Sequence, residues 1–566
     1  MQNLMNDLMK LFQKDSRIFA NGKLLKNKLT ELALKLDQSL IELLLSDKKA
    51  KGHFFVDKIV KKDKILIFDK DKFISFVNNK EFLPDSFTRF KNKIGLMTNG
   101  DYLKEKGDVV LTWAYKDCVL EGGQDKEDQK RDEIFHNETL SPDEIDRLFE
   151  PKVLTNFMRY DGKKALTVTG FNDDDNLIIK GNNLLALHCL KQKYRGQVKL
   201  IFIDPPYNTE NDSFKYNDKF THSTWLTFMK NRLEIAKELL SYDGSIYVQL
   251  DYNEVHYFKV LMDEVFGRES FQREIVWDIS VLSGFKTIAN NWIRGHDTIL
   301  FYSKDRNNFI FNKQKMAHRK EYLDRFNKTD KDGRKYFDGR GDKLYLDEVI
   351  KKGKPVGDVW YDIMSFQQIP TAKERVDFDT QKPEALLERI IQASSNDGDI
   401  VLDFFAGSGT TGTVAHKLKR QYILVEQIEK QAEVLKNRLK KVVKGKDEGA
   451  IAKKRKWKGG GSFVYAELKE WNEQYMTDIE DANTTLKLLK IYGRMRKESF
   501  FRYDIDLSKF EEQEFKKLTL KEQKQVLCEC LDKNHLYVAL SEINDTMYKV
   551  SADDKKLNKE FHKTVI

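Results

Sequence analysis

Short apolar runs alternate with helical patterns in two stretches of the chain, residues 177–267 and 382–426. The runs are continuous rather than alternating, which is typical of strands buried on both faces of a parallel sheet. The expected strands span residues 177–180, 200–203, 245–250, 400–403 and 422–426. The expected helices span residues 184–190, 223–240, 254–266, 382–391 and 413–418. This strand–helix order predicts an α/β fold with a mostly parallel sheet and crossover helices.

The rest of the chain follows other patterns. Residues 1–115 mix amphipathic helices, such as 29–45, with short apolar runs, such as 64–68. A charge-dense segment, 121–132, predicts a surface loop or linker, and Ser141 begins an expected helix. Between residues 268 and 378 the strand–helix alternation breaks. We therefore expect five regions: 1–150, 151–267, 268–378, 379–445 and 446–566, with mixed α/β structure in the two terminal ones.

Composition narrows the class of protein. The 566 residues are 40% hydrophobic and 33% charged, which indicates a globular protein of several domains. No run approaches the roughly 20 apolar residues of a membrane span, and no signal peptide is visible, so we expect a cytoplasmic protein with no membrane partner. Four cysteines without zinc-ligand spacing indicate a reducing compartment and no metal site. A net charge of +9 is compatible with a polyanionic partner.

The turn Asp204-Pro-Pro-Tyr207 directly follows the strand 200–203. Open α/β sheets bind ligands just beyond the carboxyl ends of their strands, where Asp204 would lie. Pro205 and Pro206 fix φ and make the turn stiff. The alternative is a plain strand terminator with an exposed carboxylate and ring. Trp225, which opens the next helix, is expected in the core.

A glycine-rich turn follows the strand 400–403 and reads Gly407-Ser-Gly-Thr-Thr-Gly412, with Glu426 ending the next strand. Glycines let the backbone approach a ligand, and an acid at the next strand end can accept from both hydroxyls of a ribose. The pattern predicts a site for an adenosine-containing cofactor. Taken alone it also fits a nicotinamide oxidoreductase or a structural tight turn. The candidate residues are Asp403, Phe404, Phe405, Ala406, Gly407, Ser408, Gly409, Thr410 and Glu426.

Basic and aromatic residues are interleaved between 268 and 378, among them Arg294, Arg334, Trp277 and Trp360. Such side chains neutralise phosphates and stack on or bond to bases, so the segment is a candidate nucleic-acid surface. Acids are mixed in, so a solvated, charge-balanced surface is the alternative.

The two turns together resemble the DNA amino-methyltransferases that use S-adenosylmethionine. Asp204–Tyr207 matches their D-P-P-Y motif, and Phe405–Gly409 matches their F-x-G-x-G motif. The catalytic motif comes first and the basic insert lies between, which resembles the β arrangement, where the insert is the target recognition domain. Lys382 and Pro383 are similar to the family's additional cofactor-binding segment. The resemblance implies a Rossmann-like methyltransferase core with permuted motif order.

Further segments resemble the modification subunit of type III restriction–modification systems. These are Lys180-Gly-Asn-Asn-Leu184, residues 536–543 and residues 553–558. The resemblance implies double-stranded DNA as substrate, a homodimer, and a helicase–nuclease restriction subunit as partner. Asn182 stands where many relatives carry Asp in the turn facing the cofactor adenine, and we keep it as a candidate.

The motif residues predict a mechanism. Asp204 and the carbonyl of Pro205 would accept the two hydrogens of an exocyclic base amine, and Tyr207 would stack on the extruded base. The resemblance implies that an Asp at the first motif position favours the N6 amine of adenine over the cytosine amine. The remaining alternatives are a stand-alone regulatory adenine or N4-cytosine methyltransferase and a non-catalytic DNA-binding specificity subunit.

Overall fold

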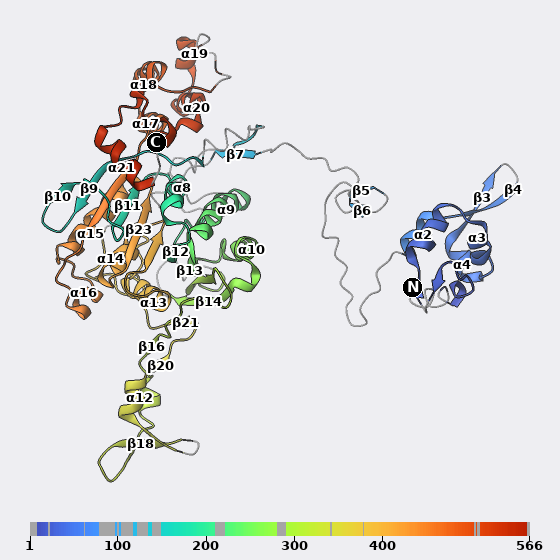
Figure 1. The fold of residues 1–566 in the computed structure, drawn as a ribbon, viewed down its shortest axis with the longest axis horizontal. Helices are drawn as coiled ribbons and strands as arrows, with labels where there is room; N and C mark the ends of the chain where they lie inside the picture. Colours follow the sequence, from blue (N-terminus) through green and yellow to red (C-terminus); the bar gives the residue numbers. More distant parts are fainter. Residues whose placement is uncertain are drawn as a thin grey trace. The chain divides into compact units, whose positions relative to one another are not determined.

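A computed structural model gives the fold of the chain in two compact units, residues 1–112 and 113–566 (Figure 1). The described residues are 8, 10–20, 23–60, 63–77, 97–98, 101–102, 117–121, 134–138, 149–209, 221–279, 290–339, 342–376, 378–502, 505 and 510–562. The helix expected to begin at Ser141, and nearly all of the expected linker, lie outside them.

The first unit is a small helical body with its own core. Its elements up to residue 77 are β1 (Phe19–Ala20), β2 (Lys23–Leu24), α2 (Lys26–Leu34), α3 (Gln38–Leu45), α4 (Lys48–Phe54), β3 (Phe55–Val60), β4 (Asp63–Phe68) and α5 (Lys70–Val77). Phe12, Phe54 and Phe73 are fully buried at its centre. The prediction of one helix over 29–45 is wrong. Leu36 has a φ of +51°, and the carboxylate of Asp37 then accepts from the N–H of Leu40 and begins α3.

The second unit is built around one sheet, which has eleven strands among the described residues. In spatial order these are β10 (Ala165–Thr167), β9 (Leu154–Tyr160), β24 (Phe463–Leu468), β11 (Asn176–Lys180), β23 (Gln421–Glu426), β22 (Ile400–Asp403), β12 (Val198–Ile203), β13 (Leu240–Leu250), β15 (His296–Ser303), β14 (Phe271–Asp278) and β21 (Val359–Trp360). From β24 to β13 all neighbouring strands are parallel, and β9 and β15 flank them antiparallel. The predicted α/β fold with a mostly parallel sheet is confirmed.

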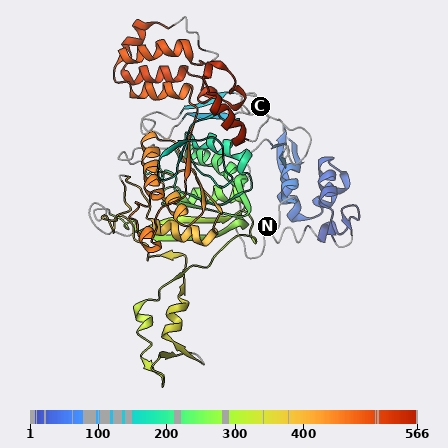
Figure 2. The same cartoon turned by 60° about the vertical axis from the view of Figure 1, so that its left-hand side comes forward.

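Helices cover both faces of this sheet (Figures 1 and 2). The side chains of one face, such as Ile201 and Ile203, pack with α8 (Asn183–Tyr194), α9 (His222–Leu239) and α10 (Val255–Phe266). Those of the other face, such as Leu200 and Phe202, pack with α13 (Glu384–Ser394), α14 (Thr410–Lys417) and α15 (Glu429–Val443). Successive strand residues thus enter two different cores, which is why the strands are apolar throughout.

The segment between 268 and 378 divides into sheet strands and an arm. β14, β15 and β21 extend the central sheet, so Trp277 and Trp360 are buried in a core. The remaining elements are η2 (Arg268–Ser270), β16 (Lys315–Met316), α11 (Lys320–Leu323), β17 (Lys328–Thr329), β18 (Lys335–Asp338), β19 (Lys343–Tyr345), α12 (Leu346–Lys352) and β20 (Lys354–Pro355). β16 pairs with β20 at the base of the arm, which residues 315–355 form and which extends away from the sheet (Figures 1 and 2).

The C-terminal residues complete the sheet and add a helical body. β24 lies between β9 and β11, and the amide of Asn558 bonds to both backbone groups of Leu154 at 2.8 and 2.7 Å. The expected boundary at residue 445 therefore divides one sheet, because β24 lies after it in sequence and β9 and β11 lie before it. The helices are α16 (Ala450–Arg455), α17 (Asn472–Asp481), α18 (Thr485–Glu498), α19 (Glu512–Lys517), α20 (Leu520–Cys530) and α21 (Ala552–His562), with short 3₁₀ turns at 533–535, 540–542 and 546–548. α17 to α20 enclose a separate hydrophobic cluster.

The remaining short strands are β5 (Met97–Thr98), β6 (Asp101–Tyr102), β7 (Asp117–Glu121) and β8 (Ile134–Glu138). Across the described part of the chain, no helix combines the length and apolar character that crossing a membrane requires.

Candidate active site

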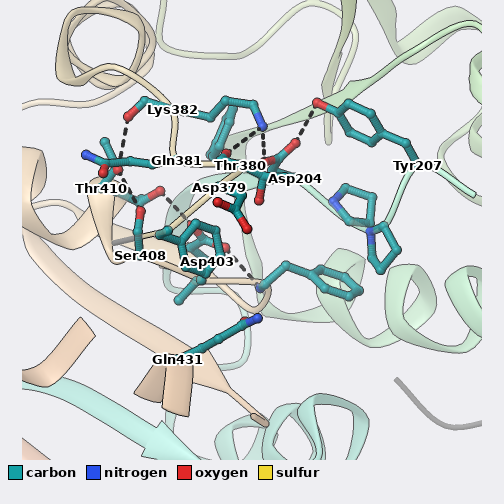
Figure 3. A pocket seen from close by; sticks show the side chains of 18 of the residues that line it. Asp204, Tyr207, Asp379, Thr380, Gln381, Lys382, Asp403, Ser408, Thr410 and Gln431 are labelled. Atoms are coloured by element: carbon teal, nitrogen blue, oxygen red, sulfur yellow. Dashed lines mark hydrogen bonds and ion pairs between the residues drawn. The ribbon is translucent and has the colours of Figure 1, made fainter. Parts of the chain in front are cut away.

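The carboxyl ends of β12, β22 and β23 open into one cavity of about 310 Å³ (Figure 3). Asp204 follows β12, Asp403 ends β22 and Glu426 ends β23. These three strands are neighbours in the sheet, so the two motifs meet although about 200 residues separate them in sequence. Of the candidate site residues, all line the cavity except Asn182, Pro383 and Gly409.

The carboxylate of Asp204 is engaged on both oxygens (Figure 3). Its Oδ2 forms an ion pair with the ammonium of Lys382, and its Oδ1 accepts from the hydroxyl of Tyr207 at 2.7 Å. Burial raises the pKa of Asp204, while the ammonium and the phenol favour its charged form. Burial also raises the pKa of Tyr207, and the adjacent carboxylates add to that shift, so its phenol is a hydrogen-bond donor.

Side-chain hydrogen bonds hold the turn Asp204–Tyr207, here called the proline turn, and the residue that follows it. The indole N–H of Trp225 donates to the carbonyl of Pro206 at 2.9 Å, and the expected place of Trp225 in the core is confirmed. Asn208 follows with a φ of +58°, and its amide donates to Glu254 at 2.6 Å. These bonds fix a left-handed residue immediately after Tyr207 and leave the turn little freedom.

The glycine turn is held by the acids at the strand ends. Asp403 accepts from the hydroxyl of Thr411 at 2.6 Å and from the N–H of Phe405 at 3.0 Å. Deep burial raises the pKa of Asp403 to about 7, although these two hydrogen bonds act to lower that pKa. Glu426 accepts from the N–H of Gly407 at 2.8 Å and from that of Ile428 at 3.0 Å. Both carboxylates are therefore fixed at the wall of the cavity.

A buried ion network supports the back of the glycine turn. The guanidinium of Arg438 donates to Thr410 at 2.8 Å, to the carbonyl of Ser408 at 3.3 Å and to Glu384 at 3.3 Å. The ammonium of Lys417 contacts Glu384 and Asp447, each at 2.6 Å. Sequence reasoning missed these residues, because they are spread over three helices and a loop, and no local motif marks them.

The three candidate residues that do not line the cavity are each the N-cap of a helix. Asn182 caps α8, where its side chain accepts from the N–H of Leu184 at 3.1 Å. Pro383 is the N-cap of α13, and Gly409, with a φ of +74°, is the N-cap of α14. The neighbour of Asn182 does reach the cavity: the amide of Asn183 donates to the carbonyl of Phe404 at 2.9 Å.

The structure adds residues that the motifs did not predict. Asp297 of β15 lies beside Tyr207, with 3.4 Å between its Oδ2 and the phenol oxygen, and accepts from Gln249 at 2.9 Å. Arg294 forms an ion pair with Asp297 and lines the cavity. Gln427, next to Glu426 in sequence, also lines the cavity. Arg294 belongs to the basic segment that the sequence marks as a candidate nucleic-acid surface, whereas no sequence pattern marks Asp297 as a site residue. Among the described residues, no group of three or more His, Cys, Asp or Glu side chains could hold a metal ion.

Family models match two parts of the chain. The model described as DNA methylase matches residues 198–437, and the model described as the type III restriction/modification enzyme methylation subunit matches residues 37–96. A curated relative, described as the probable HindVI Mod subunit of a type III restriction–modification enzyme from Haemophilus influenzae, is 33% identical over 99% of this chain and 98% of its own length. The chain belongs to this family of type III modification subunits.

The modification subunit is therefore an S-adenosylmethionine-dependent, adenine-specific DNA methyltransferase. The StyLTI Mod subunit of Salmonella typhimurium is 28% identical over 45% of this chain and 52% of its own length. Among solved structures, the complex of M1.HpyAVI with S-adenosylmethionine is 20% identical over 46% of this chain and 98% of that chain, with a TM-score of 0.31.

The residues of the cavity fit the cofactor of this family. Asp403 and Glu426 offer carboxylates to a sulfonium and to ribose hydroxyls. The side-chain carbonyl of Gln427 is buried, lines the cavity and has no hydrogen-bond partner among the described residues, so it is an open acceptor for a purine amine. Lys382 offers an ammonium to a carboxylate.

Proposed function

We propose that the modification subunit binds the extruded adenine at Asp204–Tyr207 and the cofactor at Asp403–Thr410 with Glu426, so that the two meet inside one cavity. The observation that carries this proposal is the convergence of both turns at the ends of adjacent strands. When bound, S-adenosylmethionine supplies a methyl group on a positively charged sulfur. All other requirements of the reaction fall to the side chains and carbonyls of the chain.

The amine of adenine needs to be held and turned, because its lone pair is delocalised into the ring. The carboxylate of Asp204 and the carbonyl of Pro205 would accept its two hydrogens and direct the lone pair toward the methyl group. Such positioning supplies up to about 7–11 kcal/mol in favourable cases. The nitrogen would take the methyl group while the sulfur keeps the electron pair of the broken sulfur–carbon bond, and the methylated amine would then release its proton to solvent. Asp204 is thus an orienting acceptor, with no need to remove the proton beforehand.

Tyr207 is placed to hold the ring of the base. Its phenol is tied to Asp204 at 2.7 Å, so its orientation is set by the same group that receives the amine. Stacking on an extruded base offsets a few kcal/mol of lost stacking in the duplex. The guanidinium of Arg294 lies 5.8 Å from the centre of the Tyr207 ring and brings positive charge to this side of the cavity.

We further propose that the arm and adjoining parts of 268–378 read the DNA sequence, and that the terminal regions serve assembly. Support for the second point is that the type III model matches residues 37–96, which lie in a unit separate from the methyltransferase sheet. A homodimer that binds a helicase–nuclease restriction subunit in the cytoplasm is the assembly we propose.

The proposed function is tested with labelled S-adenosylmethionine and duplex DNA, followed by mass spectrometry of the digested DNA. We expect label in N6-methyladenine for the natural protein and none for Asp204→Ala. Calorimetry serves as the control, because Asp204→Ala should retain cofactor binding. Label in N4-methylcytosine, or equal loss of cofactor binding and transfer in the variant, would contradict the assigned roles.

A further inference from the structure

Lys382 touches both halves of the active site (Figure 3). Its ammonium pairs with Asp204, the proposed amine acceptor, and also donates to the carbonyl of Thr380 at 3.2 Å. Its own backbone carbonyl accepts from the hydroxyl of Thr410 in the glycine turn at 3.2 Å. Lys382 thus joins the glycine turn to the proline turn, Asp204–Tyr207.

The backbone of Lys382 is fixed relative to the glycine turn. Thr410 is held by Arg438, and Arg438 also binds Glu384, two residues beyond Lys382. Glu384 and Lys417 are fully buried, so this network is shielded from water. The flexible part of Lys382 is its side chain, which can exchange partners without moving the turn.

Both oxygens of Asp204 are engaged in this arrangement, since Lys382 donates to Oδ2 and Tyr207 donates to Oδ1. Each carboxylate oxygen can accept a second hydrogen, so a target amine would share Asp204 with these donors or compete with them. The phenol of Tyr207 has a second acceptor within reach, because Asp297 lies 3.4 Å away. The ammonium of Lys382 can leave Asp204 only if another anion pairs with it. Among the described residues that line the cavity, the cations are Lys382 and Arg294, and Arg294 is already paired with Asp297 and Asp251.

We propose that Lys382 is a positioning residue with two alternative anionic partners: Asp204 in the free protein and the carboxylate of the bound cofactor. Binding of the cofactor then releases Asp204 to accept the target amine. The proposal rests on the proposed function, since it needs both ligands in the one cavity. Because coupling between two sites is reciprocal, Asp204 must in turn weaken cofactor binding in the free protein.

The size of the effect follows from the burial of the pair. The side chains of Lys382 and Asp204 are 12% and 18% exposed, so their attraction is screened less than that of a surface pair. Removing the charge of Asp204 should therefore tighten cofactor binding by about three- to tenfold. A ligand without the cofactor's carboxylate should show no such change.

Calorimetry on the full-length protein tests this with two ligands. S-adenosylhomocysteine carries the amino-acid end of the cofactor, and 5′-methylthioadenosine lacks it. We expect Asp204→Asn to tighten binding of the first ligand only, and Lys382→Met to weaken binding of the first ligand only. In the Lys382→Met background, Asp204→Asn should have no effect on either ligand. Thermal melts confirm folding, and Lys382→Gln is the second variant if Lys382→Met does not fold.

The pH dependence of methylation gives an independent measurement. The groups that bear on the charge of Asp204 are Lys382, Tyr207, Asp297 and Asp403. Without the ammonium, burial acts with less opposition, so the pKa of Asp204 in the free protein rises. The acid limb of kcat/KM for the cofactor, which reports the free protein, therefore moves to higher pH. Lys382→Arg keeps the charge and should leave the limb in place.

Several results would overturn the proposal. These are an equal response of both ligands to Asp204→Asn, weaker binding of S-adenosylhomocysteine in that variant, or additive effects in the double variant. They are distinct from failure of the proposed function. If Asp204→Asn still methylates DNA, the proposed role of Asp204 is wrong. If this variant loses methylation but binds S-adenosylhomocysteine no more tightly, only the proposed exchange of partners by Lys382 is wrong.

Discussion

The indole N–H of Trp225 donates to the carbonyl oxygen of Pro206 at 2.9 Å. Trp225 is fully buried in α9, where its ring meets that of Phe258 edge-on at 5.4 Å between centres. The turn Asp204–Tyr207 is thereby tied to a rigid core helix. This bond uses one acceptor position of the Pro206 carbonyl. The carbonyl proposed for the target amine is that of Pro205.

Replacing Trp225 by Phe should slow methyl transfer more than it destabilises the fold. The variant keeps an aromatic ring in the core but leaves the Pro206 carbonyl without its donor, at a cost of about 1–3 kcal/mol. We expect kcat to fall about tenfold while the affinity for S-adenosylhomocysteine is kept. Phe258→Leu is the control, since it disturbs the same core and spares the bond. A normal kcat in Trp225→Phe would show that this bond does not position the turn.

Much of the fold was predictable because its signals are local. The strands 177–180, 200–203, 400–403 and 422–426 lie within β11, β12, β22 and β23, since a run buried on both faces needs no distant partner to be recognised. The helix expected at 413–418 begins three residues earlier, because Gly409 adopts the left-handed conformation and lets α14 start at Thr410.

The features that could not be predicted from the sequence depend on contacts between distant segments. β24 enters the sheet between β9 and β11, and β15 brings Asp297 to Tyr207, which lies 90 residues away in sequence. Neither contact leaves a pattern in the local sequence. Lys382 was predicted from its motif as a cofactor residue, and that role stays a prediction. Its pairing with Asp204 became visible only in three dimensions.

Asp403 should make the stability of the free protein fall as pH rises. Its pKa is raised from 3.8 to about 7 in the folded state, so between these values the folded state binds more protons than the unfolded one. Its carboxyl therefore costs most stability above pH 7, by up to about 4 kcal/mol. Asp403→Asn removes this cost, so its melting temperature relative to the natural protein should rise between pH 5 and pH 8. A constant difference across that range would contradict the raised pKa.

Gly407→Ala should weaken cofactor binding through the shape of the turn. Gly407 has a φ of +49°, and an added Cβ would lie 3.0 Å from the ring of Phe378, which also lines the cavity. We expect at least a tenfold loss of affinity for S-adenosylhomocysteine. Gly398→Ala is the matched control, because Gly398 also has a positive φ, +85°, with nothing within 4 Å of an added Cβ. Both variants should lose about 1 kcal/mol of stability, and only the first should lose affinity.

Removing the arm should separate DNA recognition from cofactor binding. Met316 of β16 pairs with Lys354 of β20, so residues 317–353 can be replaced by a two-residue Asn-Gly turn that closes this hairpin. Among the described residues, the central sheet and the cavity contain none of this segment. We expect an unchanged affinity for S-adenosylhomocysteine and loss of methylation at the natural site. Methylation of the same sites by the shortened protein would show that the arm does not read DNA.

A milder variant tests whether the arm contacts phosphates. Lys351 and Lys352 are exposed in the last turn of α12, while Lys516 and Lys517 are exposed at the same position of α19. Each phosphate contact contributes about 0.9 to the slope of log affinity against log salt concentration. Replacing the α12 pair by Ala should reduce that slope by up to about 2 if both lysines contact the backbone of DNA. The α19 pair, each member of which is bound to a glutamate of its own helix, is the control and should leave the slope unchanged. Equal slopes in the two variants would place the phosphate contacts of the modification subunit elsewhere.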